Sequence, residues 1–380
     1  MSKAIELTIY RMVRSGHART ARAIEAATGL SRGTVSQRIA ALLASSLLRE
    51  GAPAASDGGR PARSYEVNPD YRNLIGVDLG EHVGRACLLD LHGRILDQTH
   101  FALDLRADPE ITLRHVVEAS QALSLSNART APVAALGLAV PAPVDVASGH
   151  VVKPSVMYGW ENLDIREWIT RQTGLTVVID KDVNLMCLAE HRLSWPSCEN
   201  FAFIKIGTGI GCGIITGGNL LRGVSGTAGD LGHIQHRLQP YHLCRCGKKG
   251  CTEAHAAGWA LARDLRAKGF DCEDARDVMR LWTNGEPEAL KLIHMSSRVL
   301  GKVSADLVAM INPEVLVIGG QLAATGEAML AGVRELIYQR CLPLATQNLD
   351  IRLARNSTDL AVCGAAFFAM DTVPELNGEW

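Results

Sequence analysis

Short apolar runs alternate with amphipathic segments through most of the chain. Runs such as NLIGVDLG (73–80), VAALGLAV (133–140) and VLVIGG (315–320) have the length and composition of buried strands. RACLLDLHGRIL (85–96) predicts a hairpin with its turn at His-Gly, and LDIREWITRQT (163–173) has helical periodicity. Strands that alternate with helices indicate an α/β protein with mixed sheets.

A glycine-rich loop interrupts one apolar stretch, NFAFIKIGTGIGCGIITGGNLL (200–221), which predicts a strand, a loop and a second strand. Its glycines fall at 207, 209, 211 and 213, and the Lys-Ser/Thr pair of a Walker loop is absent. Alternate glycines allow backbone N–H groups to approach phosphate, but they serve hairpins and tight packing equally well. Both interpretations stay open from the sequence.

The first 72 residues have a different pattern, in which residues 20–51 predict two helices joined by a turn. Gly29 is expected to end the first helix and Ser31 to cap the second. The apolar positions expected to face inward are Ala21, Ala23, Ile24 and Ala27 on the first helix and Val35, Ile39, Leu42 and Leu43 on the second. The polar positions left facing outward are Arg32, Thr34, Ser36, Gln37 and Arg38.

Outward polar residues in the first half of a second helix are typical of a helix-turn-helix, in which they enter the major groove. Two short strands, SLLRE (46–50) and RSYEVN (63–68), enclose a loop with Arg60 between Gly59 and Pro61. This arrangement predicts a winged helix whose Arg60 suits a narrow minor groove. The plainer alternatives are a small helical bundle with a solvated face and an ordinary exposed loop arginine.

Charge is unevenly distributed over the 380 residues, although the formal net charge is only −1. Residues 1–72 contain eleven Lys/Arg and six Asp/Glu, a net charge of +5, which leaves −6 on the remainder. A basic N-terminal part on an acidic body is expected of a nucleic-acid-binding module fused to another domain. No secretory signal and no membrane-length apolar segment is evident, so we expect a cytoplasmic protein with reduced cysteines.

Three of the ten cysteines lie together in CRCGKKGC (244–251), downstream of GDLGHIQH (229–236). Three thiolates and one imidazole suit a closed tetrahedral zinc site. The predicted ligands are His233, Cys244, Cys246 and Cys251, with His236 as a rival to His233. Unliganded reduced cysteines are the alternative, and the other seven are expected to be small core residues.

With these motifs the chain resembles the ROK family of repressors, open reading frames and sugar kinases. The resemblance rests on GTGIGCGII, GDLGHIQH and CRCGKKGCTE, together with VPAPVD, GWENLDI, DKDVNLMCLAEH, INPEVLVIGG and DLAVCGAAFFA. It implies an actin-like (ribonuclease H-like), two-lobed α/β fold, a His-Cys-Cys-Cys zinc site and a homodimer or homotetramer. The implied domains are residues 1–72 for the winged helix-turn-helix, 73–181 with 360–380 for the first lobe, and 182–359 for the second lobe with the zinc site.

The resemblance also implies a sugar site. By position its residues are Ser155, Lys181, Asp182, Asp230, His233 and Glu253. Three of these depart from the family pattern, because Ser155, Lys181 and Asp230 stand where Asn, Asn and Glu are usual. Lys181 is either a cation that faces an acidic or phosphorylated sugar or a salt-bridge partner of Asp180 or Asp182.

Asp182 matches the catalytic base of the family's kinases. The first phosphate loop of those kinases reads Asp-x-Gly-Gly-Thr, and here it reads Asp78-Leu79-Gly80-Glu81-His82. A glutamate side chain repels a triphosphate and blocks close approach of the backbone, so we expect no enzyme activity.

The resulting hypothesis is a sugar-responsive, DNA-binding repressor of carbohydrate metabolism genes, whose partners are operator DNA and a monosaccharide or sugar derivative, with no membrane. An ATP-dependent sugar kinase is the alternative, and a regulator switched by a protein partner is a third.

Overall fold

The computed structural model describes residues 2–53, 62–80, 82–126, 131–145, 148–152, 157–161, 163–236, 240–355 and 358–377. The chain forms two compact units. Unit 1 comprises residues 1–139, 164–179 and 365–380, and unit 2 comprises residues 140–163 and 180–364. Residues 140–163, 180–181 and 360–364, which the sequence assigned to the first lobe, therefore lie in unit 2.

The chain begins with three helices and a two-stranded sheet. These elements are α1 (Ser2–Ser15), α2 (Ala21–Thr28), α3 (Arg32–Ala44), β1 (Leu48–Glu50) and β2 (Tyr65–Val67). β1 pairs antiparallel with β2, so that Leu48 lies opposite Val67. The two predicted helices, their turn and both short strands are confirmed.

The ends of α2 and α3 follow from local chemistry. Thr20 caps α2 by accepting a hydrogen bond from the Ala23 N–H, and Ser31 caps α3 through the Thr34 N–H. Gly29 ends α2 with φ at 68°, a left-handed conformation that glycine adopts without strain. One expectation about the apolar faces is wrong, because Ala27 is exposed.

Unit 1 is built on a five-stranded mixed sheet, in the order β5-β4-β3-β6-β9. Its strands are β3 (Asn73–Leu79), β4 (Val83–Leu89), β5 (Ile95–Ala102), β6 (Val133–Val140) and β9 (Thr176–Lys181). β3, β4 and β5 are antiparallel neighbours, whereas β3 and β6 run parallel. The expected α/β class and the hairpin at His92-Gly93 are confirmed.

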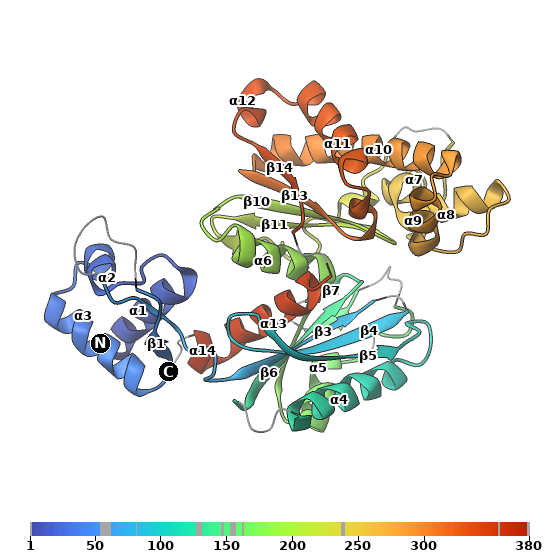
Figure 1. Cartoon of the computed structure of the whole chain (residues 1–380). Helices are drawn as coiled ribbons and strands as arrows, with labels where there is room; N and C mark the ends of the chain where they lie inside the picture. The colour runs from blue at the N-terminus through green and yellow to red at the C-terminus, as the bar shows by residue number, and fades with distance from the viewer. Residues whose placement is uncertain are drawn as a thin grey trace. The chain divides into compact units, whose positions relative to one another are not determined.

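Helices cover both faces of this sheet. Figure 1 shows α4 (Pro109–Ser126) and α5 (Ile165–Thr173) on one face and the C-terminal part of α13 (Leu360–Thr372) on the other. α13 packs very closely on β6, since a Cβ on Gly137 would lie 1.9 Å from the Ala365 carbonyl oxygen. Only glycine fits at this contact.

Unit 2 contains a second five-stranded mixed sheet, in the order β12-β11-β10-β13-β14. Its strands are β10 (Phe201–Ile206), β11 (Ile210–Thr216), β12 (Asn219–Leu220), β13 (Val315–Gly319) and β14 (Asp350–Leu353). β10 pairs antiparallel with β11 and parallel with β13. A separate short hairpin joins β7 (Val144–Asp145) to β8 (His150–Val151).

The sheet of unit 2 lies between α6 (Asp182–Ser194) on one face and the long helices α10 (Pro287–Ile311) and α11 (Glu327–Arg340) on the other (Figure 1). Strand and helix residues together form one apolar core.

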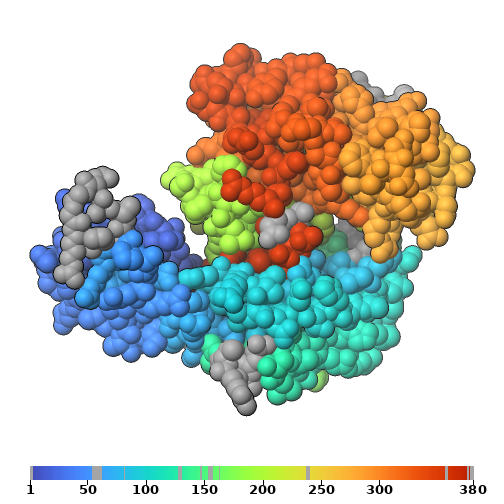
Figure 2. Space-filling model, viewed as in Figure 1, coloured from blue at the N-terminus to red at the C-terminus, as the bar shows by residue number. Residues whose placement is uncertain are grey.

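The remaining described helices are α7 (Glu253–Ala256), α8 (Gly258–Ala267), α9 (Ala275–Thr283), α12 (Pro343–Thr346), α14 (Pro374–Asn377) and the short 3₁₀ turns at Leu231–His233 and Gln321–Thr325. Figure 2 shows α8 to α11 packed into one continuous surface, coloured orange to red. Within the described residues no helix is both long enough and apolar enough to span a membrane.

The connection between β2 and β3 is short and hydrogen bonded. Asn68 donates its backbone N–H to the Leu47 carbonyl and its side-chain amide to the Ser46 carbonyl. The His92 ring bonds the Val67 carbonyl at 2.8 Å, and Arg14 of α1 bonds both the Asp371 carboxylate at 2.8 Å and the Leu376 carbonyl at 3.0 Å. The N-terminal helices are therefore fastened to the rest of unit 1.

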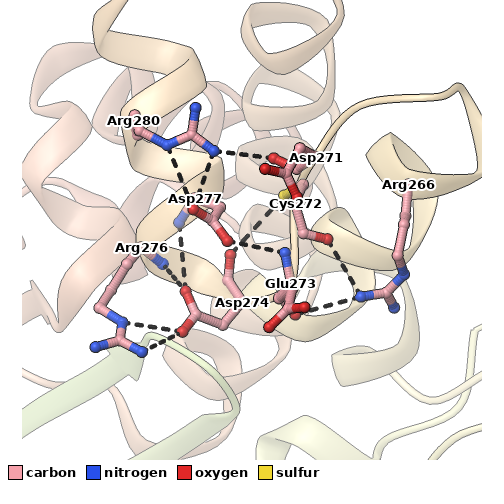
Figure 3. Close-up of polar contacts among 8 residues, drawn as sticks. All are labelled: Arg266, Asp271, Cys272, Glu273, Asp274, Arg276, Asp277 and Arg280. Atoms are coloured by element: carbon pink, nitrogen blue, oxygen red, sulfur yellow. Dashed lines mark hydrogen bonds and ion pairs between the residues drawn. The ribbon is translucent and has the colours of Figure 1, made fainter.

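A polar network fixes the start of α9 (Figure 3). The Asp274 carboxylate accepts from the backbone N–H groups of Arg276 and Asp277, at 2.7 and 3.3 Å, and pairs with the Arg276 guanidinium. Asp277 accepts from the Glu273 N–H, a hydrogen bond that lowers the pKa of Asp277, and pairs with Arg280. These four acidic and basic side chains neutralise one another, so the cluster is a helix cap rather than a ligand site.

We expect Asp274→Ala to lower the free energy of unfolding by about 1 kcal/mol, because two N–H groups at the start of α9 lose their acceptor. Urea unfolding of the full chain measures the change. Asp274→Ser retains an acceptor and is the matched control. Equal losses in the two variants would contradict the capping role.

Candidate functional site

Four potential metal ligands converge in unit 2. The ligand atoms of His233, Cys244, Cys246 and Cys251 all lie within 4.8 Å of one another. Cys246 Sγ and Cys251 Sγ are 3.7 Å apart, and Cys244 Sγ lies 3.7 Å from His233 Nδ1. Thiolates at about 2.3 Å from a tetrahedral ion lie about 3.8 Å apart, so the spacing matches a closed four-ligand site.

The neighbouring histidine does not take part in this cluster. His236 Nε2 bonds the Thr252 hydroxyl at 2.9 Å. His233 enters instead because it ends a 3₁₀ turn (Leu231–His233) whose backbone continues toward an isolated bridge between Gln235 and Cys251. Of the two histidines that the sequence allowed, the structure therefore places His233 in the cluster with the cysteines.

The cysteine loop is closed by backbone hydrogen bonds. The Cys244 N–H donates to the Lys248 carbonyl and the Gly247 N–H to the Cys244 carbonyl, while Gly247 and Gly250 take positive φ. Burial raises the pKa of the Cys244 thiol to about 11. The thiol therefore stays protonated near neutral pH unless a cation stabilises the thiolate.

Outside this loop, the seven other cysteines are free, and all except Cys341 are buried. Six of the seven therefore lie in the core as expected, and Cys341 is only partly buried.

Glu253 is buried directly after the cysteine loop, and its carboxylate is held by three donors. Oε2 accepts from the Ile210 N–H at 3.1 Å, and Oε1 accepts from Trp259 Nε1 at 3.1 Å and from the Arg245 guanidinium at 3.4 Å. Arg245 also lies over the Trp259 ring, at 5.2 Å from its centroid. Glu253 thus joins the cysteine loop, the glycine loop and α8.

Two ion pairs lie where β9 leads into α6. Asp180 accepts from Arg222 Nε at 2.7 Å and from the Asn184 amide at 2.9 Å. Asp182, at the start of α6, forms an ion pair with Lys205 of β10 and accepts from the Val183 N–H. Both carboxylates are buried and both have cationic partners.

Lys181, between these two aspartates, belongs to neither pair. Its side chain is only 8 % exposed, and within the described part of the chain no hydrogen bond or ion pair reaches its ammonium. The salt bridge to Asp180 or Asp182 that the sequence allowed is therefore not formed.

The remaining residues of the expected sugar site are placed unevenly. Asp230 is exposed and follows Gly229, whose carbonyl accepts from the Cys212 N–H. His233 is half-buried and belongs to the metal-ligand cluster. Ser155 lies outside the described residues.

The glycine loop between β10 and β11 is shaped by packing at three of its four glycines. A Cβ on Gly213 would lie 2.3 Å from Cys187 Cβ, and one on Gly211 would lie 3.0 Å from Val183. A Cβ on Gly209 would lie 2.8 Å from the Glu253 carboxylate. Close packing against α6 and Glu253 therefore accounts for these positions, which favours the structural interpretation there.

The loop that matches the first phosphate loop of sugar kinases closes on itself. The Gly80 N–H donates to the Val83 carbonyl at 3.1 Å, and a Cβ on Gly80 would lie 2.8 Å from the same oxygen. This amide is engaged within the turn. Glu81 lies outside the described residues, and His82 is exposed.

The residues of α3 that the sequence placed outward differ in solvent exposure and in their side-chain contacts. Arg32, Ser36 and Gln37 are exposed, whereas Thr34 is half-buried and bonds the capping hydroxyl of Ser31. Arg38 forms an ion pair with Glu6 of α1 at 3.0 Å. Arg60 lies outside the described residues.

Sequence reasoning missed the three basic partners of the buried carboxylates, which are Lys205, Arg222 and Arg245. Only Lys205 carried a local signal, since it is a lone charge within the apolar strand FAFIKI. Arg222 and Arg245 lie in loops, where an arginine is ordinary.

Comparison with known proteins gives these sites a context. The chain is 27 % identical over 312 residues to a protein named glucokinase from Halalkalibacterium halodurans, covering 78 % of this chain and 94 % of that protein. It is 28 % identical over 354 residues to a protein named xylose repressor from Caldicellulosiruptor bescii, covering 88 % and 87 %.

Among solved structures, a ROK family transcriptional regulator described as a homologue of the E. coli MLC protein superposes with a TM-score of 0.81. The match covers 100 % of this chain and 97 % of that one at 23 % identity, which shows a shared fold. Residues 74–372 match the ROK family. The two mixed sheets with their flanking helices therefore form the actin-like ROK fold, and the chain belongs to the ROK family.

Proposed function

We propose that the chain is a sugar-responsive, DNA-binding transcriptional repressor of carbohydrate metabolism genes. The observation that carries this proposal is the N-terminal arrangement of α1 to α3 and the β1–β2 hairpin, joined to a ROK domain. Three helices followed by a hairpin are the elements of a winged helix-turn-helix, with α3 as the helix that enters the major groove. The relative named xylose repressor supports this function.

Arg32, Ser36 and Gln37 are the residues of α3 that we propose to contact DNA, since their side chains are exposed. Arginine pairs with guanine and glutamine with adenine, while serine reaches phosphate. Arg38 holds α3 against α1 through Glu6, and Thr34 supports the cap, so both act as positioning residues. Arg60, in the loop between β1 and β2, is proposed to reach a minor groove.

A homodimer that binds two half-sites about one helical turn apart, or a multiple of that distance, fits a helix-turn-helix protein. A regulator that binds chromosomal DNA acts in the cytoplasm. The effector is proposed to bind unit 2 near Asp182, His233, Asp230 and Glu253, with Ser155 as a further contact. It alters DNA affinity through the difference between its affinities for two conformations.

A sugar kinase is the second candidate, because Asp182 and the relative named glucokinase favour it. Two observations oppose it. The Asp182 carboxylate is already engaged in an ion pair with Lys205 and a hydrogen bond from the Val183 N–H. The Gly80 N–H is bonded within its own turn and is not directed to a phosphate.

Zinc is the metal that we propose for the His233–Cys244–Cys246–Cys251 cluster. Three sulfur ligands and one nitrogen at tetrahedral spacing suit zinc, whereas Mg²⁺ and Ca²⁺ prefer oxygen. When bound, zinc would stabilise the thiolates and fold the loop that carries Arg245. His233, Cys244, Cys246 and Cys251 would then fix the position of Glu253 through Arg245.

The full chain is expected to bind a duplex selected from random DNA, with an affinity that falls steeply as salt rises, because bound phosphates release counterions. Arg32→Ala or Gln37→Ala should lower affinity on the order of tenfold. Fluorescence anisotropy measures both effects. Gln347→Ala, on the exposed surface of unit 2, is the matched control. Affinity for the selected duplex unchanged in both α3 variants would refute the role of α3.

We expect no sugar-dependent ATP hydrolysis, because Lys205 pairs with the would-be base. Coupled ADP detection over a panel of monosaccharides tests this expectation. The Asp182→Asn variant supplies the background rate. Turnover in the unaltered chain that Asp182→Asn abolishes would favour the kinase instead.

About one zinc ion per chain is expected in protein purified without chelators. Cys251→Ser should lose the metal and lower the melting temperature, because metal binding is coupled to loop folding. His236→Ala should keep the metal, since His236 bonds Thr252 instead. Elemental analysis decides, and loss of zinc from His236→Ala alone would show that the ligand set is wrong.

A further inference from the structure

One buried cation in unit 2 has no partner in the described part of the chain. The Lys181 side chain is 8 % exposed, and neither a hydrogen bond nor an ion pair to its ammonium is formed there. The ammonium is not among the buried polar atoms that lack a hydrogen-bond partner, so the stem of Lys181 is buried while its charged end reaches solvent. Lys181 thus offers a ligand a cation that no described carboxylate occupies.

The acidic neighbours of Lys181 are already engaged. Asp180 uses one oxygen for Arg222 and the other for the Asn184 amide and the Lys181 backbone N–H. Asp182 uses one oxygen for Lys205 and the other for the Val183 N–H. Each carboxylate beside Lys181 thus has its own cation, and these pairs leave one positive charge over.

In the described part of the chain, neither Glu253 nor Asp230 pairs with Lys181. On β11, burial raises the pKa of Cys212 to about 12, and the positive charge of Lys181 opposes that rise. Glu253 is held by Arg245. Asp230, which follows the residue bonded to Cys212, is exposed and forms no ion pair with Lys181.

We propose that Lys181 binds the anionic group, a phosphate or a carboxylate, of the sugar that regulates this protein. The inference rests on the proposed function and narrows its effector from monosaccharides in general to acidic ones. An ammonium that donates to an anionic oxygen makes a strong, charge-assisted hydrogen bond. A neutral sugar supplies no counter-charge to this ammonium, so the site favours an acidic sugar.

Different residues of the site would bind the anionic group of the sugar and the hydroxyls of its ring. Asp182 begins α6 one residue after Lys181, and its ion pair with Lys205 leaves it able to accept a further hydrogen bond from a hydroxyl. An acidic sugar thus meets one donor for its anion and carboxylate acceptors for its hydroxyls. Inorganic phosphate satisfies only the first of these.

Isothermal titration calorimetry of the full chain without DNA tests the inference. The probes are glucose, glucose 6-phosphate and glucuronate, N-acetylglucosamine and its 6-phosphate, xylose and xylose 5-phosphate, and inorganic phosphate alone. At least one acidic sugar is expected to bind on the order of 10- to 100-fold more tightly than its neutral counterpart. The comparison of phosphates with glucuronate identifies which anion is preferred.

Three variants assign the preference to Lys181. Lys181→Asn should bind the acidic sugar on the order of 10- to 100-fold more weakly, whereas Lys181→Arg should retain most of the preference because it keeps the charge. Lys291→Asn removes an exposed lysine of α10 and should change nothing. Thermal melts of each variant confirm that it is folded.

Several results would overturn the inference. They are the absence of binding by every acidic sugar, equal affinity for an acidic sugar and its neutral counterpart, equal affinity for inorganic phosphate and the sugar phosphate, and an unchanged preference in folded Lys181→Asn. A different result would refute the proposed function. A chain that binds acidic sugars through Lys181 but binds no DNA would refute the repressor and leave this inference standing.

Discussion

The buried carboxylate of Glu253 is the contact on which the arrangement of unit 2 depends. It accepts hydrogen bonds from the start of β11, from Trp259 of α8 and from Arg245 of the cysteine loop. Arg245 and Trp259 lie within eight residues of Glu253 on either side, whereas the start of β11 is 43 residues away, and no other single side chain described above joins all three. Because a buried donor without its acceptor costs about 1–3 kcal/mol, loss of this carboxylate would disturb the loop, the strand and the helix together.

The charged residues at the start of α6 are likewise held by specific partners. A kinase needs a carboxylate that reaches the sugar hydroxyl, and in this structure Asp182 is paired with Lys205 of β10. The same ion pair leaves Lys181 without a counter-charge, because Asp180 is bonded to Arg222.

The sequence was informative where the deciding physics is local. Ser31 and Gly29 cap and end helices through bonds to residues three or four positions away, and both were predicted correctly. The four clustered ligands were also predicted, since three of them lie within eight residues. The choice between His233 and His236 needed the backbone path, because spacing allowed either.

Contacts between segments that are distant in sequence could not be predicted from the sequence alone. The pairs of Arg38 with Glu6 and of Lys205 with Asp182 join residues more than twenty positions apart, on different elements. The helical pattern of α3 placed Arg38 outward, but α1 covers that side of the helix. The glycine loop was undecided for the same reason, since its packing on α6 appears only once β11 lies against that helix.

The effector site proposed near Lys181 is connected to the N-terminal helices through α6 and α13. Leu185, one turn into α6, packs against Gly364, where a Cβ would lie 1.9 Å from the Leu185 carbonyl oxygen. The boundary between the units falls directly after Gly364, and in unit 1 the last turn of α13 carries Asp371, which bonds Arg14 of α1. Backbone contacts this close do not deform gradually, so a shift of α6 moves the register of α13 or breaks the contact. If the proposed effector favours one position of α6, it also biases α13, to which Arg14 of α1 is bonded, by no more than the difference between its affinities for the two positions.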